Sequence, residues 1–192
     1  MRVIFVDIDG VLNYEGSISR NKTYLGIDNK RLKYLKEIAF TTGAKIVLTS
    51  SWREYYDIEK GWRQPHPNGR YLYKKFNKMH LRIYGKTRMD IPWNYRGTQI
   101  KFWLDTHDVS NYVILDDELF EDYYKLNLMP HVIKTIYRTD EDKWGGLTPN
   151  LVEEAIKILK GDLPEEGPTL DKDFKDYWFF GKEINKGDLF RV

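Results

Sequence analysis

The stretch Val3-Ile4-Phe5-Val6-Asp7-Ile8-Asp9-Gly10-Val11 decides the fold of this chain. Its first four residues are apolar, which is typical of a buried strand. Asp7 and Asp9 lie two positions apart on extended backbone, so their carboxylates project the same way, and Gly10 permits a sharp turn. Open α/β sheets bind ligands at the carboxyl ends of their strands. Because carboxylates this close repel one another, the pattern indicates a metal ion and phosphoryl transfer.

Asp and Gly are also common in ordinary turns, so the rest of the sequence has to decide between a turn and a site. Apolar runs predict strands over residues 2–7, 44–48, 80–84, 112–115 and 132–137. Helical spacing and end signals predict helices from Asp28-Asn29 to Gly43, over 98–104, and from Pro149 onward. Alternating strands and helices imply an α/β fold whose parallel sheet is covered on both faces.

We expect one catalytic domain over residues 1–160, with residues 53–95 as an insertion or small cap-like segment. The tail 161–192 contains Tyr177-Trp178-Phe179-Phe180, which is too apolar for a free linker. We therefore expect the tail to pack on the domain.

Composition narrows the class of protein. Charged residues make up 31% and hydrophobic residues 41% of the 192 positions, as in a globular protein, and the absence of cysteine excludes disulfides and thiolate metal sites. An apolar strand from residue 3 leaves no room for a signal peptide, and no apolar run approaches the ~20 residues of a membrane helix. We expect a cytoplasmic protein with no membrane partner.

The net charge of +2 conceals an asymmetry. Between Lys60 and Lys101 there are eleven Lys and Arg residues and one acid, Asp90. A basic block beside a phosphate site indicates a large anionic substrate. Aromatic residues interleave with it: Trp62, Tyr71, Tyr73, Phe76, Tyr84, Trp93 and Tyr95. Cations with stacking platforms are typical of single-strand binding, although several of these aromatics could instead be core and the lysines a solvated face.

Three further segments carry polar residues at the ends of predicted elements. The second strand runs into Thr49 and Ser50, Arg96 opens a helix, and Asp116-Asp117 follows the buried run Val113-Ile114-Leu115. A hydroxyl or a lone Arg at such a place is weak by itself, since these residues cap helices and occupy surfaces. Two acidic pairs with a hydroxyl and a cation between them form a strong combined signal.

This set resembles the four motifs of the haloacid dehalogenase (HAD) superfamily, in the right order over residues 2–160. Short phrases narrow the resemblance to the HAD domain of Swiss Army Knife RNA-repair proteins: DIDGVLN, SSWR at Ser50–Arg53, RGTQIKFWL at Arg96–Leu104, VILDD at Val113–Asp117 and GLT at Gly146–Thr148. The resemblance implies a HAD-like Rossmannoid three-layer sandwich and a Mg²⁺-dependent phosphatase. Many members carry Thr where Val11 stands here, a difference that leaves every catalytic atom in place.

The resemblance also implies the roles of individual residues. Asp7 would attack phosphorus and form an aspartyl-phosphate, and Asp9 would protonate the leaving oxygen and later activate water. Ser50, or its neighbour Thr49, would hydrogen-bond the phosphoryl oxygens. Arg96 would neutralise phosphoryl charge, with Lys101 as the rival cation.

The metal set implied by the resemblance consists of carboxylates and one backbone oxygen. Asp7 and Asp116 would bind Mg²⁺ directly, Asp9 through its backbone carbonyl, and Asp117 would orient a metal-bound water. An all-oxygen set suits Mg²⁺ and suits zinc poorly.

For the substrate, we expect a terminal phosphate on single-stranded RNA or DNA, as in 3′-phosphate removal during repair beside ligase or kinase partners. Arg53, Lys74, Lys75 and Trp93 are the candidate substrate-binding residues. One alternative is a small phosphate ester such as a nucleotide. Another is a non-catalytic nucleic-acid-binding module, which would not require two acidic pairs.

Overall fold

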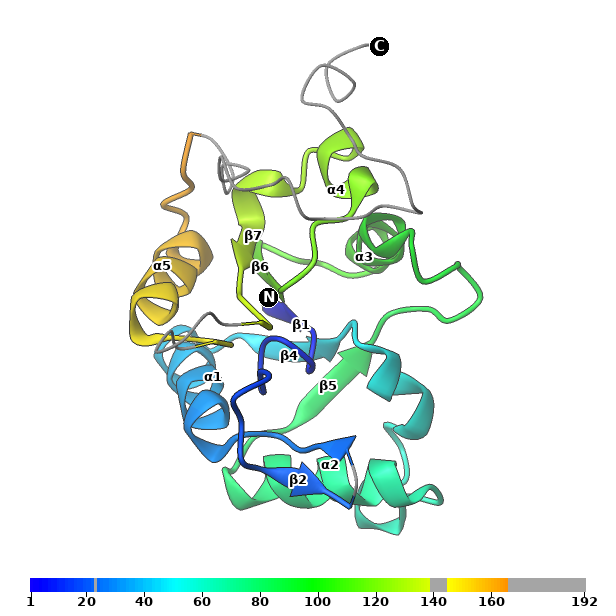
Figure 1. Cartoon of the computed structure of the whole chain (residues 1–192). Coiled ribbons are helices and arrows are strands. Elements are labelled where there is room, and N and C mark those ends of the chain that lie inside the picture. The colour runs from blue at the N-terminus through cyan, green and yellow to red at the C-terminus, as the bar shows by residue number, and fades with distance from the viewer. Residues whose placement is uncertain (23, 139–144, 166–192) are drawn as a thin grey trace, which may run out of the picture.

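A five-stranded parallel sheet forms the centre of the computed structural model, which describes residues 1–22, 24–138 and 145–165 (Figure 1). The strand order is β5-β4-β1-β6-β7. The strands are β1 (Arg2–Val6), β4 (Lys45–Leu48), β5 (Ile83–Lys86), β6 (Asn111–Asp116) and β7 (Val132–Lys134). A separate antiparallel hairpin consists of β2 (Arg20–Asn21) and β3 (Tyr24–Leu25). The predicted parallel α/β sheet is confirmed.

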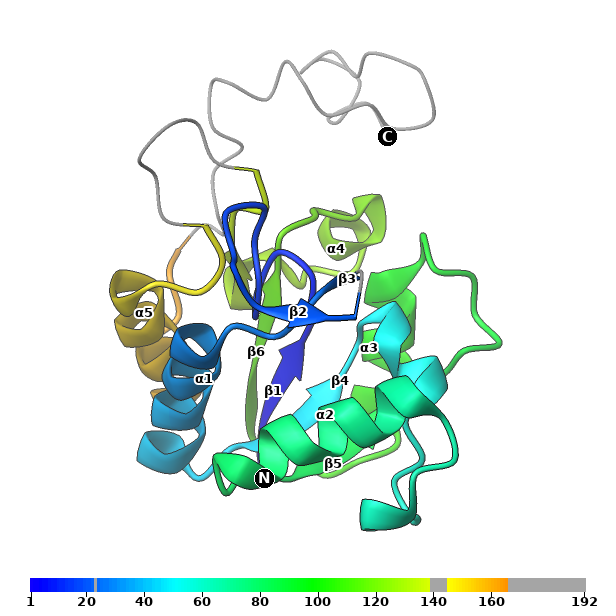
Figure 2. The ribbon, with the colours of Figure 1, turned by 60° about the horizontal axis from the view of Figure 1, so that its bottom comes forward.

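Helices cover both faces of this sheet because alternate strand residues are apolar on both sides (Figure 2). Ile4 and Val6 belong to one core cluster, which includes buried residues of α1 (Asn29–Thr42), α2 (Pro67–Lys78) and α5 (Pro149–Lys160). Val3 and Phe5 belong to a second cluster with α3 (Arg96–Asp105) and α4 (Glu121–Lys125). The result is the expected three-layer sandwich. Short 3₁₀ helices complete the described elements: η1 (Ser51–Tyr55), η2 (Gly61–Arg63) and η3 (Met129–His131).

The ends of α1 are set by side-chain chemistry that was legible in the sequence. Asp28 is the N-cap, and its carboxylate accepts hydrogen bonds from the backbone N–H groups of Lys30 (2.7 Å) and Arg31 (3.3 Å). Gly43 ends the helix in the left-handed region, with φ of 68°. Both helix boundaries agree with the prediction.

Residues 53–95 are built largely into the sandwich. β5 pairs with β4 as an edge strand, and Leu72 and Phe76 of α2 are buried in the same core cluster as the strands. This part of the segment therefore packs against the main sheet. The sequence signal for α2 was present, since His66 accepts a hydrogen bond from Asn68 N as the N-cap residue and Pro67 occupies the first turn.

Two observed strands differ from the predicted ones by more than one residue at an end. The strand expected over 80–84 occupies 83–86, because His80 adopts φ of 59° at the end of α2 and cannot continue an extended strand. The strand expected over 132–137 ends at Lys134, and Ile136 is exposed. The expected packing of Tyr177 to Phe180 falls outside the described residues. Within those residues, no helix has both the length and the apolar character to cross a membrane.

The chain leaves β1 in one direction to build β4 and β5, and later returns to build β6 and β7 on the other side. The strand order therefore reverses between β1 and β6. In open α/β sheets this reversal opens a crevice at the carboxyl ends of the two strands. Asp7 follows β1, and Asp116 ends β6, so both acidic pairs lie where the strand order reverses.

Candidate active site

Asp7 lies in a row of polar residues that the strand register creates. Val6 pairs with Leu48 on one side and with Leu115 on the other. The ladder continues one step further, since Asp7 N donates to Leu115 O (3.0 Å) and Thr49 N donates to Val6 O (3.0 Å). The next residues along the three strands therefore come level: Thr49, Asp7 and Asp116.

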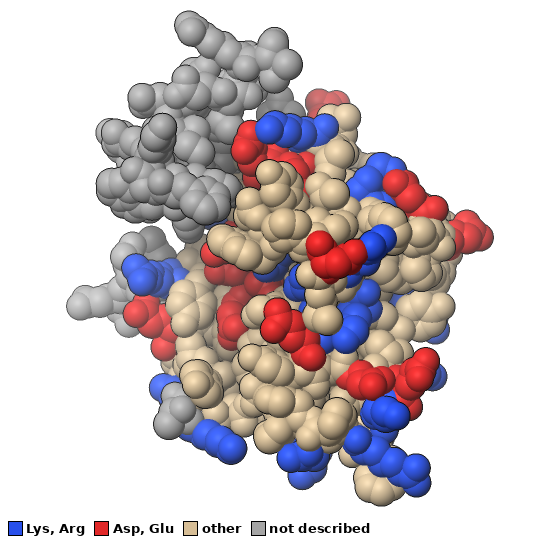
Figure 3. Space-filling view, turned by 90° about the vertical axis from the view of Figure 1, so that its right-hand side faces the viewer, with Lys and Arg blue, Asp and Glu red and all other residues tan. Residues whose placement is uncertain are grey.

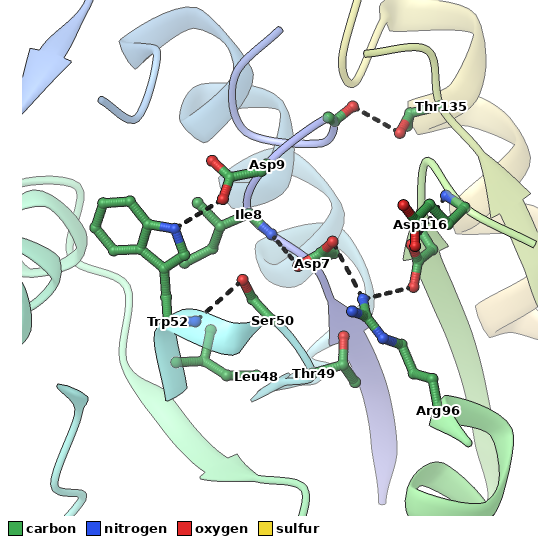
Figure 4. Close-up of polar contacts among 12 residues, drawn as sticks. Asp7, Ile8, Asp9, Leu48, Thr49, Ser50, Trp52, Arg96, Asp116 and Thr135 are labelled. Carbon is green, nitrogen blue, oxygen red and sulfur yellow. Dashed lines mark hydrogen bonds and ion pairs between the residues drawn. The ribbon is translucent and has the colours of Figure 1, made fainter. Parts of the chain in front are cut away.

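Arg96 connects the two acidic strand ends (Figure 4). Its Nη1 lies 3.1 Å from Asp7 Oδ2 and 2.9 Å from Asp116 Oδ2. Burial opposes the charge of the guanidinium, but the carboxylates of Asp116 and Asp7 raise the pKa of Arg96 well above its ordinary value. The predicted cation is thus in contact with the predicted nucleophile. Lys101 instead pairs with Asp105 on the surface of α3.

The first turn of α3 is held by a residue that sequence reasoning missed. The carboxylate of Asp122 accepts hydrogen bonds from Gly97 N (3.0 Å), Thr98 N (2.7 Å) and Thr98 Oγ1 (3.0 Å). A Cβ at residue 97 would lie 2.9 Å from the Asp122 carboxyl carbon, so glycine allows this approach. Asp122 acts as a remote cap for the helix that begins at Arg96, and fixes where the guanidinium stands.

Asp116 is fully buried and surrounded by donors. Tyr123 Oη donates to its Oδ2 (2.9 Å), and the Glu118 N–H donates to its Oδ1 (3.1 Å). Burial nevertheless raises the pKa of Asp116 to about 7, with Arg96 opposing the shift and Asp7 adding to it. Tyr123 lies seven positions after Asp116 and was not predicted as a site residue, because its contact with Asp116 depends on where α4 places the side chain.

Three carboxylates converge at this site. Asp7, Asp116 and Asp117 each offer an oxygen atom, and these atoms lie within 4.8 Å of one another. Burial, followed by the charges of Asp116 and Asp7, raises the pKa of Asp117 to about 8. Within the described residues, Arg96 is the cation in contact with Asp7 and Asp116, and burial, with the neighbouring carboxylates adding to it, raises the pKa values of Asp116 and Asp117. All-oxygen donors with excess negative charge fit Mg²⁺, which Asp7, Asp116 and Asp117 would hold.

Gly10 makes room for this cluster. It adopts φ of 78°, and a Cβ built there would lie 2.1 Å from Asp117 Cγ. Thr135 Oγ1 donates to its carbonyl oxygen (2.7 Å), which ties the turn after β1 to the end of β7. The glycine therefore serves both the backbone turn and the position of the Asp117 side chain.

We expect Gly10→Ala to displace Asp117 and to lower the unfolding free energy by about 1–3 kcal/mol through backbone strain. Gly43→Ala is the matched control, since Gly43 has φ of 68° but no atom within 4 Å of the added Cβ. Isothermal titration with Mg²⁺ should show weakened binding for Gly10→Ala alone. Equal Mg²⁺ affinity in the two variants would contradict this role of Gly10.

The Asp9 side chain points away from Asp7 and Asp116 (Figure 4). Trp52 Nε1 donates to its Oδ2 (2.9 Å), and Asn13 Nδ2 donates to its Oδ1 (2.7 Å). Burial raises the pKa of Asp9, although these two hydrogen bonds oppose the shift. The Asp9 carboxylate is thus not part of the cluster of three. Sequence reasoning missed Trp52 and Asn13, although both lie inside the motif phrases.

Two hydroxyls lie near Asp7, and their surroundings differ. Ser50 Oγ accepts a hydrogen bond from Trp52 N (3.4 Å) at the start of η1. Thr49 Oγ1 is buried and makes no hydrogen bond within the described part of the chain. Figure 4 shows both side chains on the β4 side of Asp7. The geometry keeps both as candidates for contact with a phosphoryl group.

The four predicted substrate-binding residues fall into two groups. Arg53 is buried, with hydrogen bonds to Thr49 O and Gln99 Oε1, and Lys75 Nζ donates to Ile27 O and Asn29 Oδ1 at 2.9 Å each. These two cations therefore hold the scaffold together. Lys74 is exposed, and Trp93 is 63% exposed.

The raised pKa values predict how pH and Mg²⁺ together affect stability. Burial raises the pKa of Asp116 to about 7 and the pKa of Asp117 to about 8, from 3.8 for an unaffected carboxyl group. Between these limits the folded state binds more protons than the unfolded chain, so metal-free stability should fall as pH rises. Mg²⁺ needs the ionised carboxylates, so its stabilising effect should grow with pH over this range.

Thermal unfolding with and without saturating Mg²⁺ tests this, at about pH 6 and about pH 8.5, on either side of the two pKa values. We expect the gain in Tm from Mg²⁺ to be clearly larger at the higher pH, and to shrink in Asp117→Asn. A gain that is the same at both pH values would count against a metal site at these carboxylates.

Comparison with known families finds one match. The model for the HAD domain in Swiss Army Knife RNA repair proteins matches residues 3–140, which include both acidic pairs and Arg96. No curated protein and no solved structure matches the chain. The match covers most of the sequence, and the buried aspartate cluster is consistent with the metal site of HAD domains. The chain therefore belongs to the family of HAD domains in Swiss Army Knife RNA repair proteins.

Proposed function

We propose that the chain is a Mg²⁺-dependent phosphomonoester hydrolase that removes a terminal phosphate from a nucleic acid, acting as a 3′-phosphatase in end repair. One observation carries the proposal: Asp7 lies at the strand-order reversal in contact with Arg96 and within 4.8 Å of two further carboxylates. A nucleophile, a fixed cation and an all-oxygen metal site are the parts that phosphoryl transfer needs.

The chemistry takes place in two steps at Asp7. Its carboxylate attacks phosphorus, a new P–O bond forms, and the ester P–O bond breaks while Asp9 gives its proton to the leaving oxygen. Asp9 then takes a proton from water, which attacks phosphorus, releases inorganic phosphate and restores Asp7. Arg96 stabilises negative charge on the phosphoryl oxygens. Bound Mg²⁺ supplies positive charge that offsets the repulsion between phosphate and carboxylates.

Ser50, or its neighbour Thr49, supplies the hydroxyl contact to the phosphoryl group. Ser50 Oγ already accepts from Trp52 N, which leaves its O–H free to donate, whereas the Thr49 hydroxyl has no partner within the described residues. Replacing each by Ala separates them. The residue that contacts the phosphoryl oxygens should lose turnover about 10- to 100-fold, the usual effect of one charge-assisted hydrogen bond.

Support for a nucleic-acid substrate comes from the RNA-repair context of the family and from exposed aromatics around the β5–α3 loop. Trp93 is 63% exposed and Tyr95 is 50% exposed, directly before Arg96. Aromatic platforms beside a phosphate site are suited to stacking the terminal bases. Such an enzyme would act on single-stranded ends in the cytoplasm, before a ligase or kinase acts on the same end.

A small phosphate ester such as a nucleotide is the second candidate, and the distribution of charge favours it. Figure 3 shows acidic side chains among the Lys and Arg on one face, so the basic residues do not form an uninterrupted patch there. Arg53 and Lys75 are engaged within the scaffold, which leaves fewer cations for a long strand.

A substrate panel distinguishes the two candidates: 3′- and 5′-phosphorylated RNA and DNA oligomers, mononucleotides and an aryl phosphate, each with and without Mg²⁺. We expect a strong preference for one oligomer end. The logarithm of the binding constant should fall by about 0.7 for each phosphate contacted when the logarithm of the salt concentration rises by one. Trp93→Ala should weaken oligomer binding, whereas Phe40→Ala, equally exposed at 63% but on α1, should not. Turnover of the small esters alone would overturn the nucleic-acid assignment.

A further inference from the structure

The structure assigns Trp52 as a positioning residue that holds the Asp9 carboxylate through its indole N–H, an inference that rests on the proposed function. Trp52 Nε1 donates to Asp9 Oδ2 at 2.9 Å across 43 positions of sequence. An indole nitrogen carries one N–H and can only donate. The contact is therefore a directed hydrogen bond to the carboxyl group that must give and take the proton.

The indole is itself fixed on several sides. Trp52 is 8% exposed and lies in η1, directly after β4. Its ring packs against Tyr71 of α2, with ring centres 6.1 Å apart, and Tyr71 Oη accepts from Ile27 N (2.8 Å). A side chain held by packing and by its own helix can set the direction of its partner, because neither can rotate freely.

Asn13 fixes the other oxygen of the same carboxyl group. Its Nδ2 donates to Asp9 Oδ1 at 2.7 Å, while its Oδ1 accepts from Gly10 N at 3.0 Å. Asn13 is fully buried, and its amide is oriented by the turn itself. Each carboxyl oxygen of Asp9 thus accepts one N–H hydrogen bond. Asn13 and Trp52 act only as donors toward Asp9, so neither can take a proton from it.

This arrangement defines what Trp52 contributes. Each carboxyl oxygen keeps a second lone pair, and the proton that Asp9 carries must lie on one of these remaining positions. Holding both oxygens fixes the rotation of the carboxyl group, and with it the direction in which the O–H points. The benefit is realised when the leaving oxygen needs a proton, and it is small when the leaving group departs as a stable anion.

The test compares two substrates of the wild-type protein and of Trp52→Phe, a change that removes the N–H and keeps an aromatic ring. With an alkyl phosphate ester, whose leaving oxygen needs a proton, we expect kcat/KM, which covers the steps up to departure of the leaving group, to fall about 10- to 100-fold, as for one hydrogen bond to a charged group. With p-nitrophenyl phosphate, whose leaving group is already a stable anion, kcat/KM should change by less than about threefold. Trp103→Phe is the matched control, since Trp103 is 6% exposed in the other core cluster.

A double-mutant cycle with Asp9→Asn shows whether the effect passes through Asp9. Once Asp9 is replaced by Asn, adding Trp52→Phe should not lower the turnover of p-nitrophenyl phosphate or of the alkyl ester any further. Equal losses on both esters in Trp52→Phe, or a full loss in the Asp9→Asn background, would overturn the assignment, because a structural defect would act in that way. Absence of turnover by the wild type on every ester would instead refute the proposed phosphatase function.

Discussion

Asp7→Asn is expected to abolish turnover, by at least about 10³-fold, while the protein stays folded. An amide cannot attack phosphorus to form an acyl phosphate, so the reaction has no first step. The fold should tolerate the change, because the oxygen of the new side-chain amide can still accept from Ile8 N (2.8 Å in the wild type) and Arg96 keeps its contact with Asp116. Removing one of three neighbouring negative charges also relieves repulsion on Asp116 and Asp117.

Steady-state kinetics with p-nitrophenyl phosphate, together with thermal unfolding in the absence of Mg²⁺, measures both halves of this expectation. Asp105→Asn provides the control, since Asp105 is an exposed carboxylate on α3 whose loss should affect neither. Near-normal turnover in Asp7→Asn would contradict the nucleophile assignment. A fall in Tm of more than about ten degrees, which corresponds to about 3–5 kcal/mol for a domain of this size, would instead assign Asp7 a structural role.

Arg96→Met is expected to cost both activity and stability. The guanidinium is the one cation that the described residues place in contact with Asp7 and Asp116, and both carboxylates are largely shielded from water. Removing one partner of a buried charge pair costs about 3–5 kcal/mol, because the remaining charges are left uncompensated. The loss should grow with pH, since burial already keeps the pKa of Asp116 at about 7 and the variant removes the cation that lowers it.

Lys101→Met tests the rival cation under the same conditions. Lys101 and Asp105 are about half exposed and four residues apart on α3, so their pair should be worth no more than about 0.5 kcal/mol. Urea unfolding and initial rates should separate the two variants clearly. A comparable loss in Lys101→Met, or a stable and active Arg96→Met, would refute the assignment of Arg96.

Much of this fold could be predicted from the sequence, because local sequence signals and the burial of apolar residues indicate the same elements. The apolar runs before Asp7 and Asp116 form the two strands between which the strand order reverses. Helix α1 begins after Asp28 and ends before Gly43, as predicted. Motifs of this kind are short and local, so they can be recognised by residue type in a single sequence. They meet at one edge of the sheet because the carboxyl ends of parallel strands lie at the same edge.

Two of the residues that were missed act across long sequence distances. Trp52 reaches Asp9 from η1, and Asp122 reaches the first turn of α3 from α4. Hydrogen bonds between separate elements leave no periodicity in the sequence. The scaffold contacts of Lys75 and Arg53 were hidden for a related reason: the positive charge of the basic segment is visible in the sequence, whereas these hydrogen bonds depend on how α2 and η1 pack.

The most direct test of the central claim is a rapid-quench experiment with an oligonucleotide that carries a radiolabelled terminal phosphate. In the presence of Mg²⁺, acid quenching should trap label on the wild-type protein before inorganic phosphate appears, and borohydride reduction should convert residue 7 to homoserine. Asp7→Asn should take up no label. Phosphate release without labelled protein, or label on a residue other than Asp7, would contradict the account.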